Sequence, residues 1–144
     1  YQAQFGNFIA QTKLIACGYN NYFFHIFFIM SVTIYHNSRC SKSRATLAIL
    51  EEKNVNFEII NYLQTPPSVS ELTQLLLDLK LDARSLMRTG EAEYKAQNLN
   101  DTSLSEDELI QAMVNTPILI ERPIVKTDQG VVIGRPPENV LSII

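Results

Sequence analysis

The chain is organised around one stretch, Thr33-Ile34-Tyr35-His36-Asn37-Ser38-Arg39-Cys40-Ser41-Lys42-Ser43-Arg44. The alternating β-forming residues over Thr33 to His36 predict a short strand. A helical pattern begins at Ser43, with Leu47 and Leu50 on one face. Cys40 is therefore expected in a strand-to-helix turn, just before the N-terminus of a helix.

That position favours a reactive thiol. Unpaired backbone N–H groups and the positive end of the helix dipole stabilise an anion at a helix N-terminus. The same field favours a thiolate over a thiol, and four neighbouring side chains add to it, namely His36, Arg39, Lys42 and Arg44. A lone cysteine is more often a small buried apolar residue, and that alternative stays open for Cys40. Its polar and charged neighbours nevertheless favour a nucleophile placed where an anionic substrate binds.

Composition limits the possible classes of protein. The chain has 144 residues, which suits one domain with a real core. A net charge of −3, with no basic stripe, argues against general nucleic-acid binding. Cys17 and Cys40 form neither a disulfide framework nor a Cys-x-x-Cys pair. His25 and His36 lie far apart in the sequence, and no Cys/His cluster has metal-ligand spacing, so we expect no metal site.

The first 29 residues differ from the rest, because Lys13 is their only Lys, Arg, Asp or Glu residue. The apolar run from Phe23 to Met30 is far shorter than the roughly 20 residues that a membrane span requires. Met30-Ser31-Val32 resembles a natural start. We predict a non-native or disordered extension over residues 1–29, followed by one folded domain over residues 30–144, with no membrane span. A short membrane-surface anchor is the alternative for the extension.

The middle of the chain is predicted to be helical. Residues 57–62 alternate as a second strand, parallel to the first because a helix connects the two. Capping boxes at Ser68/Glu71 and Ser105/Glu108 predict two helices. Shorter helical pieces are expected over residues 82–87 and 91–97. Together these elements predict a helical insert over about residues 66–116.

The end of the chain returns to strands. Strands are expected over residues 118–120, 124–127 and 131–133, with a turn at 128–130, before a last helix from Pro136 to Ile144. This order of elements predicts an α/β fold, a thioredoxin-like mixed sheet with an inserted helical subdomain.

With these elements in place, residues 30–144 resemble the glutaredoxin-coupled arsenate reductase family. Five separated blocks carry the resemblance: Tyr35-His36-Asn37 leading to Arg39-Cys40-Ser41-Lys42-Ser43-Arg44, then Tyr62-Leu63-Gln64-Thr65-Pro66-Pro67, Leu86-Met87-Arg88, Pro117-Ile118-Leu119-Ile120-Glu121-Arg122-Pro123-Ile124-Val125 and Ile133-Gly134-Arg135-Pro136. One departure is Ser38, where the family often has proline; it removes no reacting group.

The resemblance implies that Cys40 attacks arsenate while three arginines hold the oxyanion, namely Arg88, Arg122 and Arg135. Arginine suits this task independently of the resemblance, because its forked donors match oxyanions, whereas lysine acts as a point charge.

The resemblance also implies roles for four supporting residues. His36 is expected to support the thiolate electrostatically. Ser43 and Arg44 are expected either to hydrogen-bond the thiolate or to shape the loop, and a helix-capping role is equally open for Ser43. Pro123 is the candidate for the cis-proline that thioredoxin-like folds place opposite the active cysteine.

The resemblance further implies a cytoplasmic enzyme without a bound cofactor. Because the motif lacks a resolving cysteine, glutathione is expected as co-substrate and glutaredoxin as partner. The main alternative is a thioredoxin-fold relative acting on another thiol or oxyanion substrate. A transcription regulator that binds RNA polymerase is disfavoured, since such relatives usually carry a Cys-x-x-Cys switch. A phosphatase would prefer a Cys-x5-Arg loop, which is longer than the spacing from Cys40 to Arg44.

Overall fold

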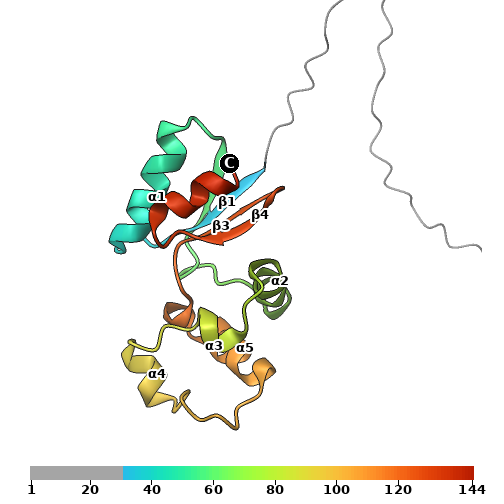
Figure 1. Ribbon diagram of the computed structural model, residues 1–144. Coiled ribbons are helices and arrows are strands. Elements are labelled where there is room, and N and C mark those ends of the chain that lie inside the picture. Colours follow the sequence, from blue (N-terminus) through green and yellow to red (C-terminus); the bar gives the residue numbers. More distant parts are fainter. Residues whose placement is uncertain (1–30) are drawn as a thin grey trace, which may run out of the picture.

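A computed structural model describes residues 31–144. The predicted extension over residues 1–29, with Cys17 and His25, lies outside the described residues. Four strands form one mixed sheet in the order β2-β1-β3-β4 (Figure 1). The strands are β1 (Val32–Tyr35), β2 (Phe57–Ile60), β3 (Ile124–Thr127) and β4 (Gly130–Ile133).

The N-terminal half of the sheet is a βαβ unit, as predicted. Strands β1 and β2 are parallel, with Ile34 opposite Ile59, and α1 (Ser41–Glu52) connects them. Strand β3 then runs antiparallel to β1, and β4 returns antiparallel to β3 with Thr127 opposite Gly130. Gly130 has a φ of 152°, which a residue with a Cβ rarely adopts, and this permits the tight connection.

Four α-helices lie between β2 and β3: α2 (Val69–Leu79), α3 (Ala83–Leu86), α4 (Ala92–Ala96) and α5 (Glu106–Asn115). Both capping boxes are present. The Ser68 hydroxyl accepts from the Glu71 N–H, and the Ser105 hydroxyl accepts from the Glu108 N–H, while each glutamate accepts from the N–H of its serine. The two predicted helix starts are therefore confirmed.

The prediction of a strand over residues 118–120 is wrong. The segment forms a 3-10 helix, η1 (Pro117–Leu119), in which the Leu119 N–H donates to the Thr116 carbonyl. Pro117 suits the first turn of a helix, and the side chain of Leu119 is fully buried. Ile120 forms only an isolated antiparallel bridge to Met87.

The last helix is also shorter and tighter than expected. It is a 3-10 helix, η2 (Pro137–Ser142), that ends before Ile143. Strand β2 likewise ends at Ile60, two residues earlier than predicted, because the Tyr62 N–H turns back to the Ile60 carbonyl.

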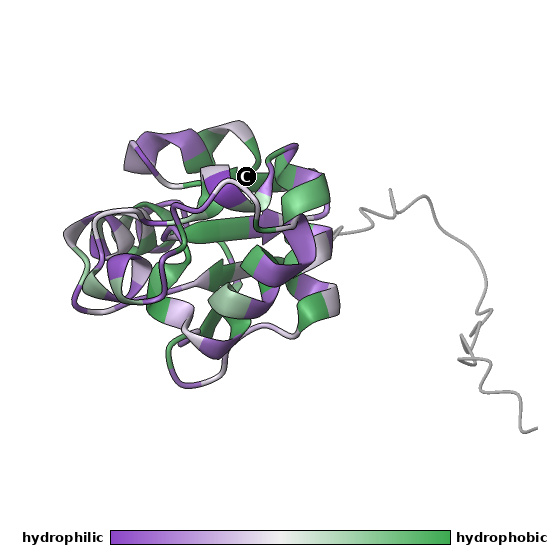
Figure 2. Cartoon of the chain, turned by 90° about the horizontal axis from the view of Figure 1, so that it is seen from below, coloured by the Kyte–Doolittle hydropathy of each residue, from purple (hydrophilic) through white to green (hydrophobic). Residues whose placement is uncertain are grey.

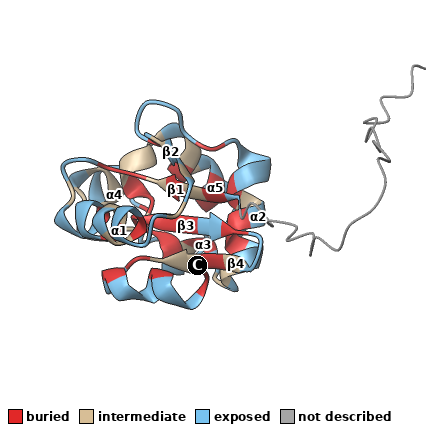
Figure 3. Ribbon diagram, turned by 90° about the horizontal axis from the view of Figure 1, so that it is seen from above, coloured by how far each residue is buried: buried red, intermediate tan, exposed pale blue. Residues whose placement is uncertain are grey.

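Two apolar clusters cover opposite faces of the sheet. On one face Ile34 and Val125 pack with Leu50 of α1 and Val140 of η2. On the other face Ile124 joins a larger cluster built from the helices between β2 and β3, including Leu72, Leu75, Leu109 and Met113. Figure 2 shows the central strands as mainly hydrophobic, and Figure 3 shows their residues as largely buried. Among residues 31–144, no helix is long and apolar enough to cross a membrane.

Candidate active site

The loop over residues 36–44, called the Cys40 loop below, joins β1 to α1. It begins where the His36 N–H extends the sheet by donating to the Ile60 carbonyl at 2.8 Å. The Cys40 N–H donates to the Asn37 carbonyl at 2.9 Å, and the Cys40 carbonyl accepts from the Arg44 N–H at 3.0 Å. Cys40 lies in the predicted strand-to-helix turn and is partly buried. It is the N-cap residue of α1, which begins at Ser41, two residues before the predicted start at Ser43.

Ser43 is the buried centre of this loop. Its hydroxyl accepts from the Asn37 N–H at 3.0 Å and lies 2.9 Å from Nδ1 of His36. Arg44 closes the loop from outside, because its Nη1 donates to the Ser38 carbonyl at 2.9 Å. The side chains of Ser43 and Arg44 therefore shape the loop, which is one of the two roles that the sequence left open for them. Neither is the N-cap residue, because Cys40 holds that position and makes no side-chain cap hydrogen bond.

His36 does not match its expected electrostatic role. Burial and then the charge of Arg44 lower the pKa of His36 below its ordinary value. A neutral imidazole predominates near neutral pH and brings no positive charge to the thiolate. The contact with Ser43 instead makes His36 part of the framework of the Cys40 loop.

The surroundings of Cys40 favour the thiolate. Burial by itself raises the pKa of the thiol, but the backbone N–H groups of Ser43 and Lys42 and the charges of Arg122 and Arg135 outweigh it. The pKa of Cys40 is therefore lowered, through the combination of helix N-terminus and nearby cations that activates cysteines.

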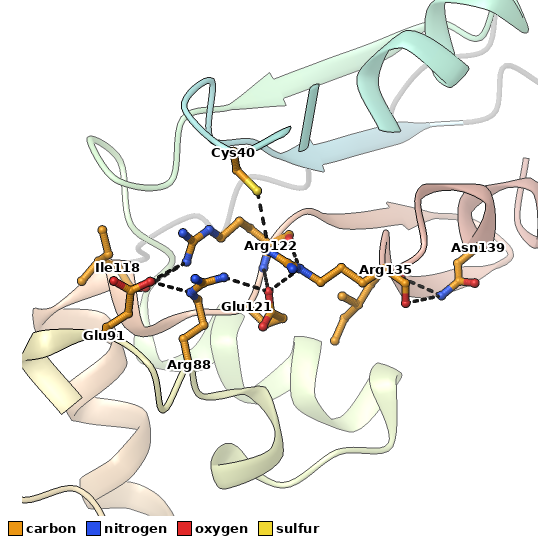
Figure 4. Close-up of polar contacts among 9 residues, drawn as sticks. Cys40, Arg88, Glu91, Ile118, Glu121, Arg122, Arg135 and Asn139 are labelled. Carbon is orange, nitrogen blue, oxygen red and sulfur yellow. Dashed lines mark hydrogen bonds and ion pairs between the residues drawn. The ribbon is translucent and has the colours of Figure 1, made fainter. Parts of the chain in front are cut away.

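Three arginines from separate segments converge beside this loop (Figure 4). Arg88 follows α3, and its N–H donates to the Leu119 carbonyl at 2.8 Å. Arg122 and Arg135 precede β3 and η2, each followed by a proline with a cis peptide bond. Nη2 of Arg135 lies 3.6 Å from Sγ of Cys40. The three arginines predicted from the sequence thus lie together, and Arg135 contacts Cys40 directly.

Arg122 is the most enclosed of the three. Its side chain is 11% exposed, against 22% for Arg88 and 36% for Arg135. Its Nη1 lies 3.4 Å from the Ile118 carbonyl, while its buried Nε has no hydrogen-bond partner within the described residues 31–144. A buried guanidinium nitrogen without an acceptor is costly unless a ligand supplies one.

Two carboxylates that the sequence analysis missed join the arginines. Glu91 accepts from Nε of Arg88 at 2.7 Å and pairs with Nη1 of Arg122 at 3.3 Å. Glu121 lies 2.7 Å from Nε of Arg135 and 3.3 Å from Nη1 of Arg88. These five residues are called the arginine cluster below. The spacing Arg88-x-x-Glu91 was an available signal for Glu91, since opposite charges three residues apart can pair. Glu121 had no such local signal, because its side-chain partners lie in other segments.

The backbone around the third arginine is closely packed. The predicted cis-proline is present at Pro123, and its carbonyl accepts from the Gly134 N–H at 2.9 Å. A Cβ at Gly134 would lie 2.5 Å from Oγ1 of Thr46 and 2.8 Å from Cγ of Pro123. Only glycine lets the chain pass this close to α1 and so bring Arg135 beside Cys40.

A cleft of about 870 Å³ opens next to the arginine cluster, lined in part by Leu79, Ile133, Arg135 and Glu138. Within residues 31–144, no group of three or more His, Cys, Asp and Glu residues could hold a metal ion. The arrangement instead offers a thiolate nucleophile beside clustered guanidinium donors, which suits an oxyanion.

Comparison with known proteins agrees with this geometry. A family model described as the ArsC family matches residues 35–143. The chain belongs to the ArsC family. It is 54% identical over 114 residues to the uncharacterized protein YfgD of Escherichia coli, covering 78% of this chain and 96% of that protein. It is 49% identical over 116 residues to an arsenate reductase of Haemophilus influenzae, covering 80% of this chain and all of that protein.

The solved structure of an arsenate reductase from Vibrio cholerae has a similar fold. It aligns with a TM-score of 0.77 and 52% identity, over 80% of this chain and 98% of the other. The prediction of an ArsC-type, thioredoxin-like mixed sheet is therefore confirmed.

Proposed function

We propose that this ArsC-family protein reduces arsenate to arsenite, with Cys40 as the nucleophile. The observation that carries the proposal is the thiol with a lowered pKa, 3.6 Å from Nη2 of Arg135 and beside two further arginines. The arsenate reductases among its relatives support the same substrate. Arg88, Arg122 and Arg135 hold the oxyanion and stabilise the charge that develops on it.

In the first step the Cys40 thiolate attacks arsenic and displaces one oxygen, which leaves with protons as water. The product is a covalent thiol–arsenate ester in which arsenic is still pentavalent. A second thiol then attacks the sulfur of Cys40. The electron pair of the S–As bond passes to arsenic, which leaves as arsenite, and the two sulfurs form a disulfide.

That second thiol comes from another molecule. Cys40 is the one free cysteine among residues 31–144, and its motif has no resolving partner. We infer that glutathione supplies the thiol and that glutaredoxin then reduces the mixed disulfide by thiol–disulfide exchange. The glutathione pool of a reducing cytoplasm is the natural setting for such a cycle.

A coupled assay tests the proposal. The full-length protein, arsenate, glutathione, glutaredoxin and glutathione reductase should give arsenate-dependent loss of NADPH, and Cys40→Ser should give none. Thioredoxin and thioredoxin reductase should not replace the glutathione system. Turnover with thioredoxin alone would contradict the proposed reductant. No arsenate-dependent turnover with either system would favour a relative that acts on another thiol or oxyanion substrate.

A further inference from the structure

A single carboxylate oxygen links all three arginines. Oε1 of Glu121 lies 2.7 Å from Nε of Arg135 and 3.3 Å from Nη1 of Arg88. The same oxygen accepts from the backbone N–H of Arg122 at 3.0 Å. These donors come from three separate segments, so Glu121 connects residues that lie far apart in the sequence (Figure 4). The Arg122 carbonyl adds a second link, because it accepts from Nε of Arg135 at 2.9 Å.

Glu91 supports the opposite side of the cluster. Its Oε1 lies 2.7 Å from Nε of Arg88 and 3.3 Å from Nη1 of Arg122. Burial raises the pKa of Glu91, but its hydrogen bonds with Arg88 and Arg122 outweigh burial and lower it. Glu91 is therefore charged near neutral pH, and each guanidinium has at least one ion pair with a carboxylate.

The ion pairs leave other donors for a ligand. Nε of Arg135 donates to the Arg122 carbonyl at 2.9 Å and forms an ion pair with Glu121 at 2.7 Å, while Nη2 is directed to Sγ of Cys40. Nη1 of Arg122 pairs with Glu91, while its buried Nε has no hydrogen-bond partner among residues 31–144. Each guanidinium is thus held through some of its N–H groups while others remain available.

We propose that Glu121 is a positioning residue, which holds Arg88 and Arg135 so that their remaining N–H groups meet an oxyanion at Cys40. The inference rests on the proposed function, because it names what orients the oxyanion site. The carboxylate acts through the arginines and does not touch the substrate. Long arginine side chains lose much rotamer freedom when they are fixed, so a preformed cluster binds an anion more tightly than a mobile one.

Protection of Cys40 from iodoacetamide by added arsenate measures anion binding without turnover. For this assay, Cys17→Ser is introduced into every full-length variant, so that alkylation reports the reactivity of Cys40 alone. Glu121→Ala should weaken protection about tenfold, since a charge-assisted hydrogen-bond network is lost. Glu138→Ala is the matched control, because Glu138 lines the cleft beside the arginine cluster but forms no side-chain hydrogen bond or ion pair with any of residues 31–144. It should leave protection within about twofold, like other surface changes.

A double-mutant cycle separates positioning from a general loss of structure. If Glu121 acts through Arg135, adding Glu121→Ala to Arg135→Lys should weaken protection by less than about threefold, much less than in the parent. If the two substitutions weaken protection by factors that multiply fully, the inference is overturned. It is also overturned if arsenate protects Cys40 in Glu121→Ala as well as or better than in the parent, and better protection would mean that the carboxylate competes with the substrate. If Glu121→Ala fails to fold, Glu121→Gln takes its place. A neutral amide binds guanidinium groups more weakly, so weaker protection is again expected.

The same assay distinguishes this inference from the proposed function. Protection of the parent together with unchanged protection of the Glu121 variants overturns the positioning role alone. Absence of protection in the parent shows that Cys40 does not lie in an arsenate site, and this overturns both proposals.

Discussion

The side-chain hydrogen bonds within the Cys40 loop join residues at most seven positions apart, whereas ion pairs of the arginine cluster join residues up to 33 positions apart. The loop is held by the start of α1 and by the buried Ser43. The cluster exists only when the segment after α3 meets the segments before β3 and η2. The proposed nucleophile is therefore prepared locally, and the proposed anion-binding arginines depend on the whole tertiary fold.

The largest expected effect comes from removing the nucleophile and leaving both regions in place. Cys40→Ser should lower arsenate turnover by at least about 1,000-fold, because a hydroxyl is a far weaker nucleophile near neutral pH. Serine is a favoured N-cap residue, so the midpoint temperature of unfolding should not fall below that of the parent. Retained turnover would move the chemistry away from Cys40, and a collapsed fold would make the thiol structural.

Changing the cluster without changing its charge comes next. Arg88→Lys, Arg122→Lys and Arg135→Lys should each lower kcat/KM for arsenate about 10- to 100-fold, because lysine lacks the fork and its separate N–H donors. The enclosed Arg122 should be the most sensitive. Steady-state kinetics with arsenate as the varied substrate check this. Parent-like values for all three variants would remove the cluster from the reaction.

Disturbing the loop should affect stability more than anion binding. Ser43→Ala leaves the Asn37 N–H without its side-chain acceptor and should lower the free energy of unfolding by about 1–3 kcal/mol. Ser41→Ala is the control, since Ser41 is exposed and lies at the start of the same helix. Urea unfolding of both variants provides the comparison. Equal stability of the two would show that the local bonds do not hold the loop.

The smallest expected effect is a displaced pH profile. Alkylation of Cys40 should have its midpoint below the ordinary pKa of a thiol, and the rate should fall as the pH drops through the pKa of the folded state. Because folding lowers this pKa, the thiolate contributes to stability fully above the pKa of the unfolded chain and no longer contributes below the folded value. If the pH midpoint of alkylation lies at or above the ordinary pKa of a thiol, burial of Cys40 outweighs the effect of the helix N-terminus and the arginines.

The contrast between the two regions also explains what the sequence could predict. The position of Cys40 in a strand-to-helix turn followed from strand and helix patterns within a dozen residues. The capping boxes at Ser68 and Ser105 were equally local. The three arginines were found through the resemblance of separated motifs, because no local pattern states that Arg88 and Arg135 meet.

The errors arose where tertiary contacts decide the structure. The apolar residues Ile118 to Ile120 look like a strand, but full burial of Leu119 and a proline at the helix start favour a 3-10 turn. His36 looked like a cation near the thiolate, and only its burial and its contact with Ser43 show otherwise. Glu121 was missed because its partners lie in other segments.

Cys40 is proposed to react with arsenate and then to be attacked by a thiol from another molecule. A single turnover with the parent, arsenate and glutathione, without glutaredoxin, tests both steps by intact-mass measurement and peptide mapping. One glutathione adduct is expected on Cys40, formed only when arsenate is present and absent from Cys40→Ser. Arsenite formed without an adduct on Cys40, or an adduct that forms equally well without arsenate, would show that Cys40 does not carry the reaction in this way.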